Sequence, residues 1–228
     1  MITLLKSFLP PVFFLFTILL LQNCQSDRKQ GAGSREQDLS KIVVLTFDDA
    51  VKSHHSFVAP LLKDLGFDAT FFITYEWMDD TVNFMSWQEV GELHTMGFEI
   101  GNHSWHHWDF SQPKTAVMLE GELGLVNWAL MQFGVPKPIS FAWNGNGFGP
   151  EALKALEKEG YQFARRGKQP EVDYGELDAG PGYMPDKHHH LLIPTTIDGY
   201  PDMELDHFVE ALESVNKNEI AILQFHGV

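Results

Sequence analysis

The sequence predicts an α/β fold in which a largely parallel sheet is covered by helices. About seven short apolar segments, rich in β-branched and aromatic residues, alternate with segments of helical spacing. Polar side chains directly follow several of the apolar segments. Strands that alternate with helices are joined by right-handed crossovers into parallel neighbours. An open doubly wound sheet and a β/α barrel both satisfy this pattern.

The first half of the pattern contains three strands and two helices. Residues 42–47 (IVVLTF) are a continuous apolar run, which is typical of a buried strand. Residues 58–65 have helical spacing and stop at a glycine. The second strand is ATFFIT at 69–74. The capping box SWQE begins the next helix, 86–97, and a short strand follows at 98–101.

The second half contains three helices and four strands. A helix is predicted over 113–133 and another over 150–159, because each begins at a proline and is followed by a glycine. Residues 204–215 have an amphipathic helical pattern. The remaining apolar segments are the predicted strands 139–142, 161–165, 191–196 and 220–225.

Composition narrows the class of protein. The chain has 228 residues, 44% of them hydrophobic, which suits one domain of moderate size with a proper core. Its formal net charge is −15 and no basic patch is visible, so nucleic-acid partners are not expected. We expect the excess of acidic residues to form a solvated, self-repelling surface.

Residues 1–23 resemble an export signal, and more specifically that of a lipoprotein. A lysine precedes an apolar run at 8–21, whose length of about 14 residues is short of the roughly 20 that span a bilayer. Cys24, the only cysteine, resembles the lipid-attachment residue of bacterial lipoproteins. Plain secretion and an uncleaved anchor are the alternatives. The polar stretch 24–40 is predicted to be a flexible linker, so we expect an exported protein that meets a membrane only through its N-terminal anchor.

Residues suited to metal binding or proton transfer follow four of the predicted strands. Asp48 and Asp49 follow the first strand, and His103 and then His107 follow the third. WNGN follows the fourth strand, and His226 follows the last. Ligands bind at the carboxyl ends of the strands in parallel α/β folds. We therefore expect these side chains to share one site.

The spacing of the histidines indicates a metal site. His103 and His107 are four residues apart, which places both imidazoles on one side of a helical turn or a helix-like loop. Together with a carboxylate from Asp48 or Asp49 they suit Zn²⁺, or another divalent transition metal, with one position open for water. The second carboxylate is then free to act as a base, and His106 is expected to point away. Each feature alone is also explained by a helix cap or a hydrogen-bonded histidine, so the hypothesis depends on their combination.

These segments resemble those of the polysaccharide deacetylase family, carbohydrate esterase family 4. The matching segments are TFDDA, HSWHH and LQFH, and the resemblance covers residues 41–228 with the same order and spacing. The first segment usually ends in glycine, where this chain has Ala50. The resemblance implies a distorted seven-stranded (β/α) barrel over 41–228. It also implies an enzyme that removes acetyl groups from the N-acetylated sugars of a polysaccharide such as chitin or peptidoglycan.

The resemblance assigns a role to each matching residue. It implies that Asp49, His103 and His107 hold the metal, usually zinc. Asp48 would be the general base, which takes a proton from the attacking water. His226 would be the general acid, which protonates the departing amine.

The resemblance also implies contacts to the substrate. Leu223 would line the pocket for the acetyl methyl group, and Trp143 and Asn144 would contact the substrate, with a backbone N–H near Trp143 at the oxyanion. The family's third segment normally carries an arginine that orients the base, but FAWNG has none, and the fourth segment is absent. We expect Arg166, or its neighbour Arg165, to supply this charge from another strand.

Other functions stay open from the sequence. They are a carbohydrate-binding pseudoenzyme, an O-deacetylase, and a hydrolase of small cyclic amides on the same barrel. The missing arginine favours the pseudoenzyme, as does the end of the chain two residues after His226, which suggests a C-terminally truncated domain. The intact Asp48 and metal ligands argue against it. A solvated turn is expected at 188–190 (HHH), with a loop near the substrate as the alternative. The particular polysaccharide and the oligomeric state are not predicted.

Overall fold

Strands and helices alternate along the chain, as the sequence pattern predicts. The structure, a computed structural model, describes residues 42–167, 179–200 and 203–227. The predicted export signal, Cys24 and the linker lie outside the described residues. The strands are β1 (Ile42–Phe47), β2 (Thr70–Ile73), β3 (Glu99–Asn102), β4 (Ser140–Ala142), β5 (Phe163–Arg166), β6 (Ile193–Pro194), β7 (Ile197–Gly199) and β8 (Ile220–Phe225). The α-helices are α1 (Ala59–Leu65), α2 (Trp87–Thr95), α3 (Pro113–Ala116), α4 (Leu119–Gln132), α5 (Pro150–Lys158) and α6 (Leu205–Ser214).

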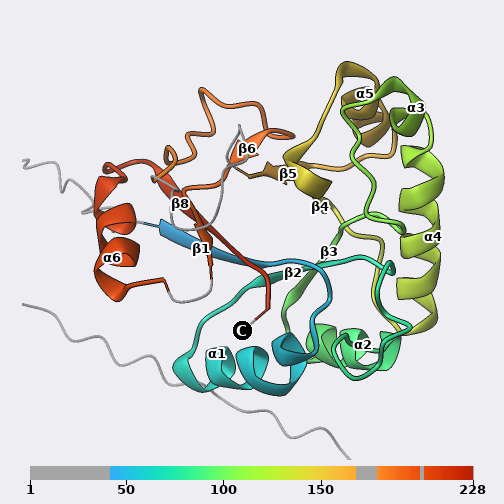
Figure 1. Ribbon diagram of the computed structural model, residues 1–228, viewed down its shortest axis with the longest axis horizontal. Helices are drawn as coiled ribbons and strands as arrows, with labels where there is room; N and C mark the ends of the chain where they lie inside the picture. Colours follow the sequence, from blue (N-terminus) through green and yellow to red (C-terminus); the bar gives the residue numbers. More distant parts are fainter. Residues whose placement is uncertain (1–41, 168–178, 201–202, 228) are drawn as a thin grey trace, which may run out of the picture. The chain divides into compact units, whose positions relative to one another are not determined.

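The strands form one sheet in the order β6-β5-β4-β3-β2-β1-β8-β7. Every hydrogen-bonded strand pair in it is parallel. Figure 1 shows the strands in the middle with the helices outside them, α1 and α2 along one side, α4 and α5 along another, and α6 beside β8. The sheet is strongly curled, so the predicted α/β barrel is confirmed.

The sheet has eight strands rather than the predicted seven, because one segment of the chain forms the edge strand at each end of the sheet. Only Thr195 and Thr196 separate β6 from β7. β6 pairs with β5, whereas β7 pairs with β8. Residues 193–199 therefore connect the two ends of the curled sheet, and they replace the single strand predicted at 191–196.

The helix predicted over 113–133 is divided into α3 and α4. At the break the N–H of Met118 donates to the carbonyl of Thr115 at 2.9 Å, a bond to the third residue back instead of the fourth, as in a 3₁₀ turn. α4 also buries Glu122 and Asn127 among its apolar residues. These buried polar groups contact the loop and strand that carry the candidate site, as described below.

Three apolar clusters hold the helices against the outside of the barrel. The largest contains Phe71 of β2, Leu93 of α2 and Leu130 of α4. The second contains Phe141 of β4 and Leu156 of α5, and the third joins α6 to β7 and β8. Each large apolar side chain buried in this way contributes about 1.5–3 kcal/mol. The packing fixes the strands whose carboxyl ends carry the site.

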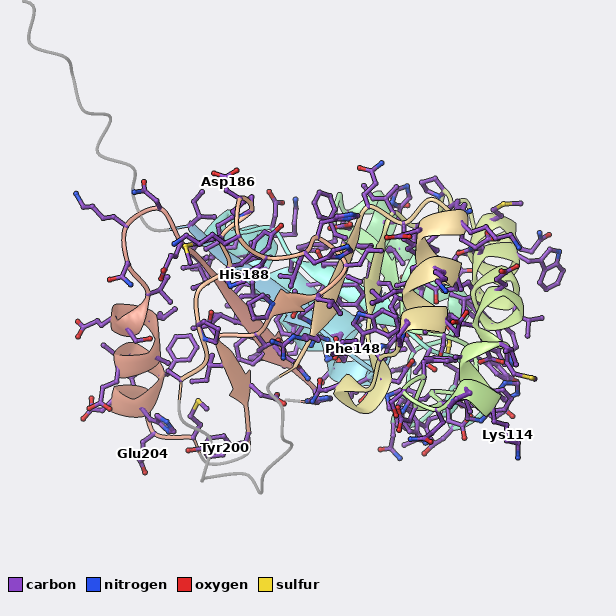
Figure 2. All side chains as sticks on the ribbon, turned by 90° about the horizontal axis from the view of Figure 1, so that it is seen from above. Lys114, Phe148, Asp186, His188, Tyr200 and Glu204 are labelled. Atoms are coloured by element: carbon purple, nitrogen blue, oxygen red, sulfur yellow. The ribbon has the colours of Figure 1, made fainter. Side chains whose placement is uncertain are left out.

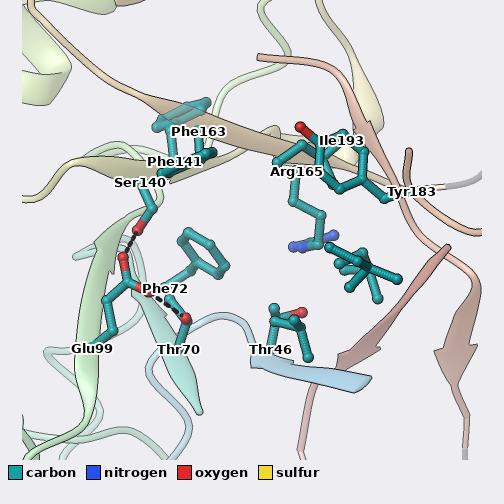
Figure 3. A pocket seen from close by; sticks show the side chains of 13 residues that line it. Thr46, Thr70, Phe72, Glu99, Ser140, Phe141, Phe163, Arg165, Tyr183 and Ile193 are labelled. Carbon is teal, nitrogen blue, oxygen red and sulfur yellow. Dashed lines mark hydrogen bonds between the residues drawn. The ribbon is translucent and has the colours of Figure 1, made fainter. Parts of the chain in front are cut away.

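The interior of the barrel is mainly apolar near the amino ends of the strands. Figure 3 shows a cavity there between Phe72, Phe163 and other side chains, with the side chain of Arg165 entering from β5. Glu99, at the start of β3, accepts hydrogen bonds from Thr70 and Ser140, both at 2.7 Å. Whereas Glu99 stays at the amino end of the barrel, the side chain of Arg165 extends from this cavity toward the opposite, carboxyl end.

The loop that contains the three consecutive histidines lies away from that carboxyl end. In Figure 2, Tyr200 and Phe148, which follow β7 and β4, lie at one end of the barrel, while Asp186 and His188 lie at the other. The position supports the predicted solvated turn at 188–190 and not a loop beside the substrate. Among the described residues, none of the helices combines the length and apolarity that a bilayer span requires.

Candidate metal centre and catalytic site

Asp49, His103 and His107 converge at the carboxyl edge of the sheet, after β1 and β3. Oδ1 of Asp49 lies 3.4 Å from Nε2 of His103 and 3.5 Å from Nε2 of His107. The two Nε2 atoms are 3.1 Å apart. Tetrahedral bonds of roughly 2.0–2.1 Å to one ion would place ligand atoms about 3.3 Å from each other. The three atoms thus have the spacing that a shared metal ion requires.

Left-handed backbone conformations direct these side chains toward one another. The φ angle is 72° at Asp49, 55° at Ala50, 60° at Ser104 and 52° at His107. Residues other than glycine rarely adopt such angles, and those that do cluster at functional sites. The segment between the histidines is a loop and not a regular helical turn. At position 50 the glycine usual in the family would adopt this conformation with less strain.

The electrostatics of the cluster favour a bound cation. Nδ1 of His103 lies 2.8 Å from the carbonyl oxygen of Ala142, and donation to that oxygen fixes the ring with its Nε2 directed toward Asp49. Burial opposes the charge of Asp49, but the imidazole of His103 outweighs it and lowers the Asp49 pKa to about 2. Burial and the neighbouring His103 lower the pKa of His107 to about 4. Near neutral pH, Asp49 is a carboxylate and His107 is neutral, as metal ligation requires.

Asp48 points to the other side of the chain and pairs with an arginine. Asp48 and Arg165 are only 2% and 3% exposed. Nη2 of Arg165 donates to Oδ2 of Asp48, and Nη1 donates to Oε1 of Gln224. Arg166 instead donates to the carbonyl of Gly167 at 3.3 Å. The arginine that contacts Asp48 is therefore Arg165 and not Arg166.

His226 follows β8 and lies between two carboxylates. Its Nε2 is 4.0 Å from Oδ2 of Asp49, and its Nδ1 is 3.5 Å from Oδ1 of Asp198. Burial disfavours the imidazolium, but Asp198 and the more distant carboxylate of Asp48 outweigh it and raise the His226 pKa to about 9. Nε2 of His54, in a π-helical turn before α1, lies 2.7 Å from the backbone carbonyl of His226 and holds this end of the chain in place.

The carboxylates and histidines of the two preceding clusters border one cavity, which His54 and the two arginines do not line. It is lined by the three candidate ligands, by Asp48 and His226, and by Trp143, Gly145, Asn146, Asp198 and Gln224. The cavity thus brings together a candidate cation site, a buried carboxylate and a histidine whose pKa is raised to about 9. Such a set is suited to acid–base hydrolysis at a polarised carbonyl.

The prediction that Leu223 lines this cavity is wrong. Its side chain packs with Ala211 of α6 on the outside of the barrel. Successive side chains of a strand point to opposite faces, so the neighbouring Gln224 faces the cavity instead. Alternation counted back from His226 would have identified Gln224, because the two positions are two residues apart.

The two residues predicted to contact the substrate after β4 differ in position. Trp143 lines the cavity, but its backbone N–H donates to the carbonyl of Arg165 at 2.9 Å and is not available to an oxyanion. Asn144 is fully buried, and its Nδ2 donates to the carbonyl of His103 at 2.8 Å. Asn144 thus supports the loop of the metal ligands instead of lining the cavity.

Asp198 was missed by the sequence reasoning although a signal for it exists. It lies in β7, two residues after the end of the strand predicted at 191–196, and its side chain faces His226. A carboxylate after a strand is the pattern that identified Asp48 and Asp49. The same rule, applied to the sixth predicted strand, would have placed Asp198 in the site.

Comparisons with known proteins agree with this fold. The model of the polysaccharide deacetylase family matches residues 35–164, which is more than half of the chain. No curated protein sequence matches the chain. The deacetylase PplD of Streptococcus pyogenes, solved with acetate, has a similar structure, with 16% identity and a TM-score of 0.60 over 78% of this chain and 74% of that chain.

Two further solved structures are similar. The peptidoglycan N-acetylglucosamine deacetylase Bc1960 has 16% identity and a TM-score of 0.57, over 82% of this chain and 73% of that chain. BA3943, a CE4 family pseudoenzyme from Bacillus anthracis, has 18% identity and a TM-score of 0.57, over 82% of this chain and 54% of that chain. At these identities the structures establish the fold alone. The match to the family model establishes more: this chain belongs to the polysaccharide deacetylase family.

Proposed function

We propose that the protein is a metal-dependent hydrolase that removes acetyl groups from the N-acetylated sugars of a polysaccharide. One observation carries this proposal. The three candidate ligands share a cavity with a buried carboxylate, Asp48, and with a histidine that is protonated at neutral pH, His226. A protein that only binds carbohydrate has no need of this combination.

Asp49, His103 and His107 fit a divalent ion, because Oδ1 of Asp49 is buried without a hydrogen-bond partner among the described residues. When bound, such an ion lowers the pKa of a coordinated water and polarises a carbonyl oxygen. Asp48 accepts the proton of the attacking water. Its Oδ2 is fixed by Arg165, while its buried Oδ1 has no hydrogen-bond partner in the part of the chain that the structure describes and is the oxygen assigned to the water.

His226 donates a proton to the amine that leaves, which would otherwise depart poorly. Asp198 keeps the imidazole charged and oriented at neutral pH. Gly145, in the turn Asn144–Asn146 after β4, has a left-handed backbone conformation and lines the cavity. We assign its N–H, in place of that of Trp143, to the oxyanion.

The proposed substrate is a polymer of N-acetylated sugars such as peptidoglycan or chitin. The activity of the similar enzyme Bc1960 on peptidoglycan N-acetylglucosamine supports this class. An export signal at 1–23 and lipidation at Cys24 would place the enzyme where such polymers occur. The net charge of −15 supports the expectation that nucleic acids are not partners.

Acetate release from N-acetylglucosamine oligomers and from peptidoglycan tests the proposal. The zinc-loaded chain is expected to release acetate, and Asp48→Asn with the same zinc content is expected to release almost none. Absence of acetate release from every N-acetylated glycan by a zinc-loaded wild type would contradict the proposal.

The alternative with a specific observation behind it is a carbohydrate-binding pseudoenzyme. The arginine of the third family segment is missing, and the fold is similar to that of a CE4 family pseudoenzyme. Arg165 at Asp48 argues against this alternative, because the charge is supplied from β5. Glycan binding without acetate release would favour it. Release from O-acetylated glycans alone, or opening of a small cyclic imide, would favour the two other hydrolases.

A further inference from the structure

Glu122 is a buried acid that contacts the loop between the two metal-binding histidines. It lies in the first turn of α4 and is 3% exposed. Oε2 accepts hydrogen bonds from the backbone N–H groups of Trp105 at 3.1 Å and His106 at 2.7 Å, and Oε1 lies 2.8 Å from Nδ1 of His106. The ring of His106 also stacks on Trp108, with 4.7 Å between centroids. His106 is therefore turned toward α4 and not toward Asp49.

Glu122 and the loop between the two histidines stabilise each other. A carboxylate that is buried without hydrogen-bond donors is costly, so Glu122 stays in place only while the loop presents its N–H groups. The position of Glu122 near the amino end of a helix also favours a negative charge. The loop, in turn, has left-handed conformations at Ser104 and His107. Such conformations persist only where surrounding contacts over-determine them.

Other contacts hold the carbonyl and the ring of Trp105, because Thr74 donates to that carbonyl at 3.3 Å and Tyr75 stacks on the indole. Two asparagines hold the beginning of the loop. The side chain of Asn102 accepts a hydrogen bond from the N–H of Ser104 at 2.8 Å, and Asn144 donates to the carbonyl of His103. Glu122 instead contacts the two consecutive amides in the middle of the loop, between the two ligands. The orientation of the second ligand relative to the first therefore depends on Glu122 more than on either asparagine.

We propose that Glu122 is a positioning residue, which holds the loop in the conformation that lets His103 and His107 bind one divalent cation. This inference rests on the metal site of the proposed function. Glu122 acts through the backbone of Trp105 and His106. His106, the histidine between the two ligands, acts with it as a second contact to α4.

The test compares variants of the full-length chain for Zn²⁺ affinity, by competition with a chromogenic chelator, and for hydrogen exchange at Trp105 and His106. Glu122→Gln keeps the size of the side chain but removes its negative charge and replaces one of its two acceptor oxygens by an NH2 donor. We expect an affinity loss of about 10–100-fold, as for other groups that orient metal ligands. Faster exchange at the two amides is expected as well.

Two controls separate positioning from general destabilisation. Glu120→Gln changes an exposed acid on the same helix, whose partner is Lys158 at 2.6 Å, and should alter neither readout. Leu130→Ala removes a buried apolar side chain from α4 and should lower the unfolding temperature while Zn²⁺ affinity stays at the wild-type value.

Wild-type affinity with unchanged exchange in Glu122→Gln would overturn the inference. So would an equal loss of affinity in Leu130→Ala at a similar unfolding temperature. A wild type that binds no Zn²⁺ would contradict the proposed function. The hydrogen-exchange rates at Trp105 and His106 would then still show whether Glu122 holds the loop. Unchanged rates in Glu122→Gln would overturn the positioning role.

Discussion

The two sides of the cavity differ in how their charges are balanced. On the acid–base side each charge faces a counter-charge, because Asp48 pairs with Arg165 and His226 pairs with Asp198. On the metal side Asp49 is a carboxylate beside a neutral His107, and its buried Oδ1 has no hydrogen-bond partner among the described residues. The acid–base side thus consists of paired opposite charges, whereas the metal side places one carboxylate oxygen beside two imidazole nitrogens, an arrangement suited to an added cation. This difference predicts which changes abolish activity and which disturb the fold.

Removal of the metal should have the largest effect on activity. Its effect on stability should be limited to the free energy that metal binding adds to the folded state. Chelation should abolish acetate release, and added Zn²⁺ should restore it. Zn²⁺ that binds only the folded state should stabilise it by about 2.7 kcal/mol at a hundred times its Kd. Calorimetry with and without Zn²⁺ measures this shift, and Asp49→Asn serves as the control that should show none. Full activity in excess chelator would contradict the claim that the side of the cavity with Asp49, His103 and His107 requires a bound cation.

Asp48→Asn should retain the metal and lose the chemistry. The amide cannot accept the proton of water, so we expect kcat to fall by about 10²–10⁴-fold, the usual contribution of a general base. Zn²⁺ content, measured by elemental analysis, should stay at the wild-type level because Asp48 lies outside the ligand cluster. Equal losses of metal and activity would show that Asp48 is a ligand instead.

Arg165→Met should reduce both activity and stability, because it leaves the carboxylate of Asp48 buried without a partner. Loss of one member of a buried ion pair typically costs about 3–5 kcal/mol. Urea unfolding of the metal-free protein measures this cost. Arg166→Met, one residue away, is the matched control and should cost less than about 1 kcal/mol. The double variant Asp48→Asn with Arg165→Met should be more stable than Arg165→Met alone, and a result in the opposite direction would contradict the pairing.

Asp198→Asn should have the smallest effect at neutral pH and a clear one in alkali. The folded-state pKa of His226 is raised to about 9, so the acid form is present below that pH and is lost as pH rises through it. Without the Asp198 carboxylate this pKa moves toward 6.5, and the alkaline limb of kcat/KM should move to lower pH with it. Asp206→Asn, on an exposed position of α6, should leave the profile unchanged. An unshifted limb in Asp198→Asn would mean that His226 is not the acid.

The sequence predicts the metal side better than the acid–base side, for a physical reason. Asp49 follows a predicted strand by two residues, and His103 and His107 belong to one short loop, so local spacing reveals all three candidate ligands. Arg165 and Asp198 come from strands that meet only in the folded barrel. Their contribution depends on which face of a strand points inward, and an error of one residue reverses that face.

Two errors have this origin. The sequence favours Arg166 over Arg165, and the family resemblance assigns Leu223 to the pocket that Gln224 lines. Element positions were predicted well because apolar runs, capping boxes and prolines act locally. The pairing of residues 193–199 with both ends of the sheet was not predicted, because it depends on closure of the whole barrel.

The most direct test of the central claim is the position of a bound metal ion in a crystal of the Zn²⁺-loaded chain, located by anomalous scattering at the zinc edge. We predict one ion within about 2.0–2.2 Å of Nε2 of His103, Nε2 of His107 and a carboxylate oxygen of Asp49. An ion bound elsewhere, or no anomalous peak at this cluster, would contradict the account.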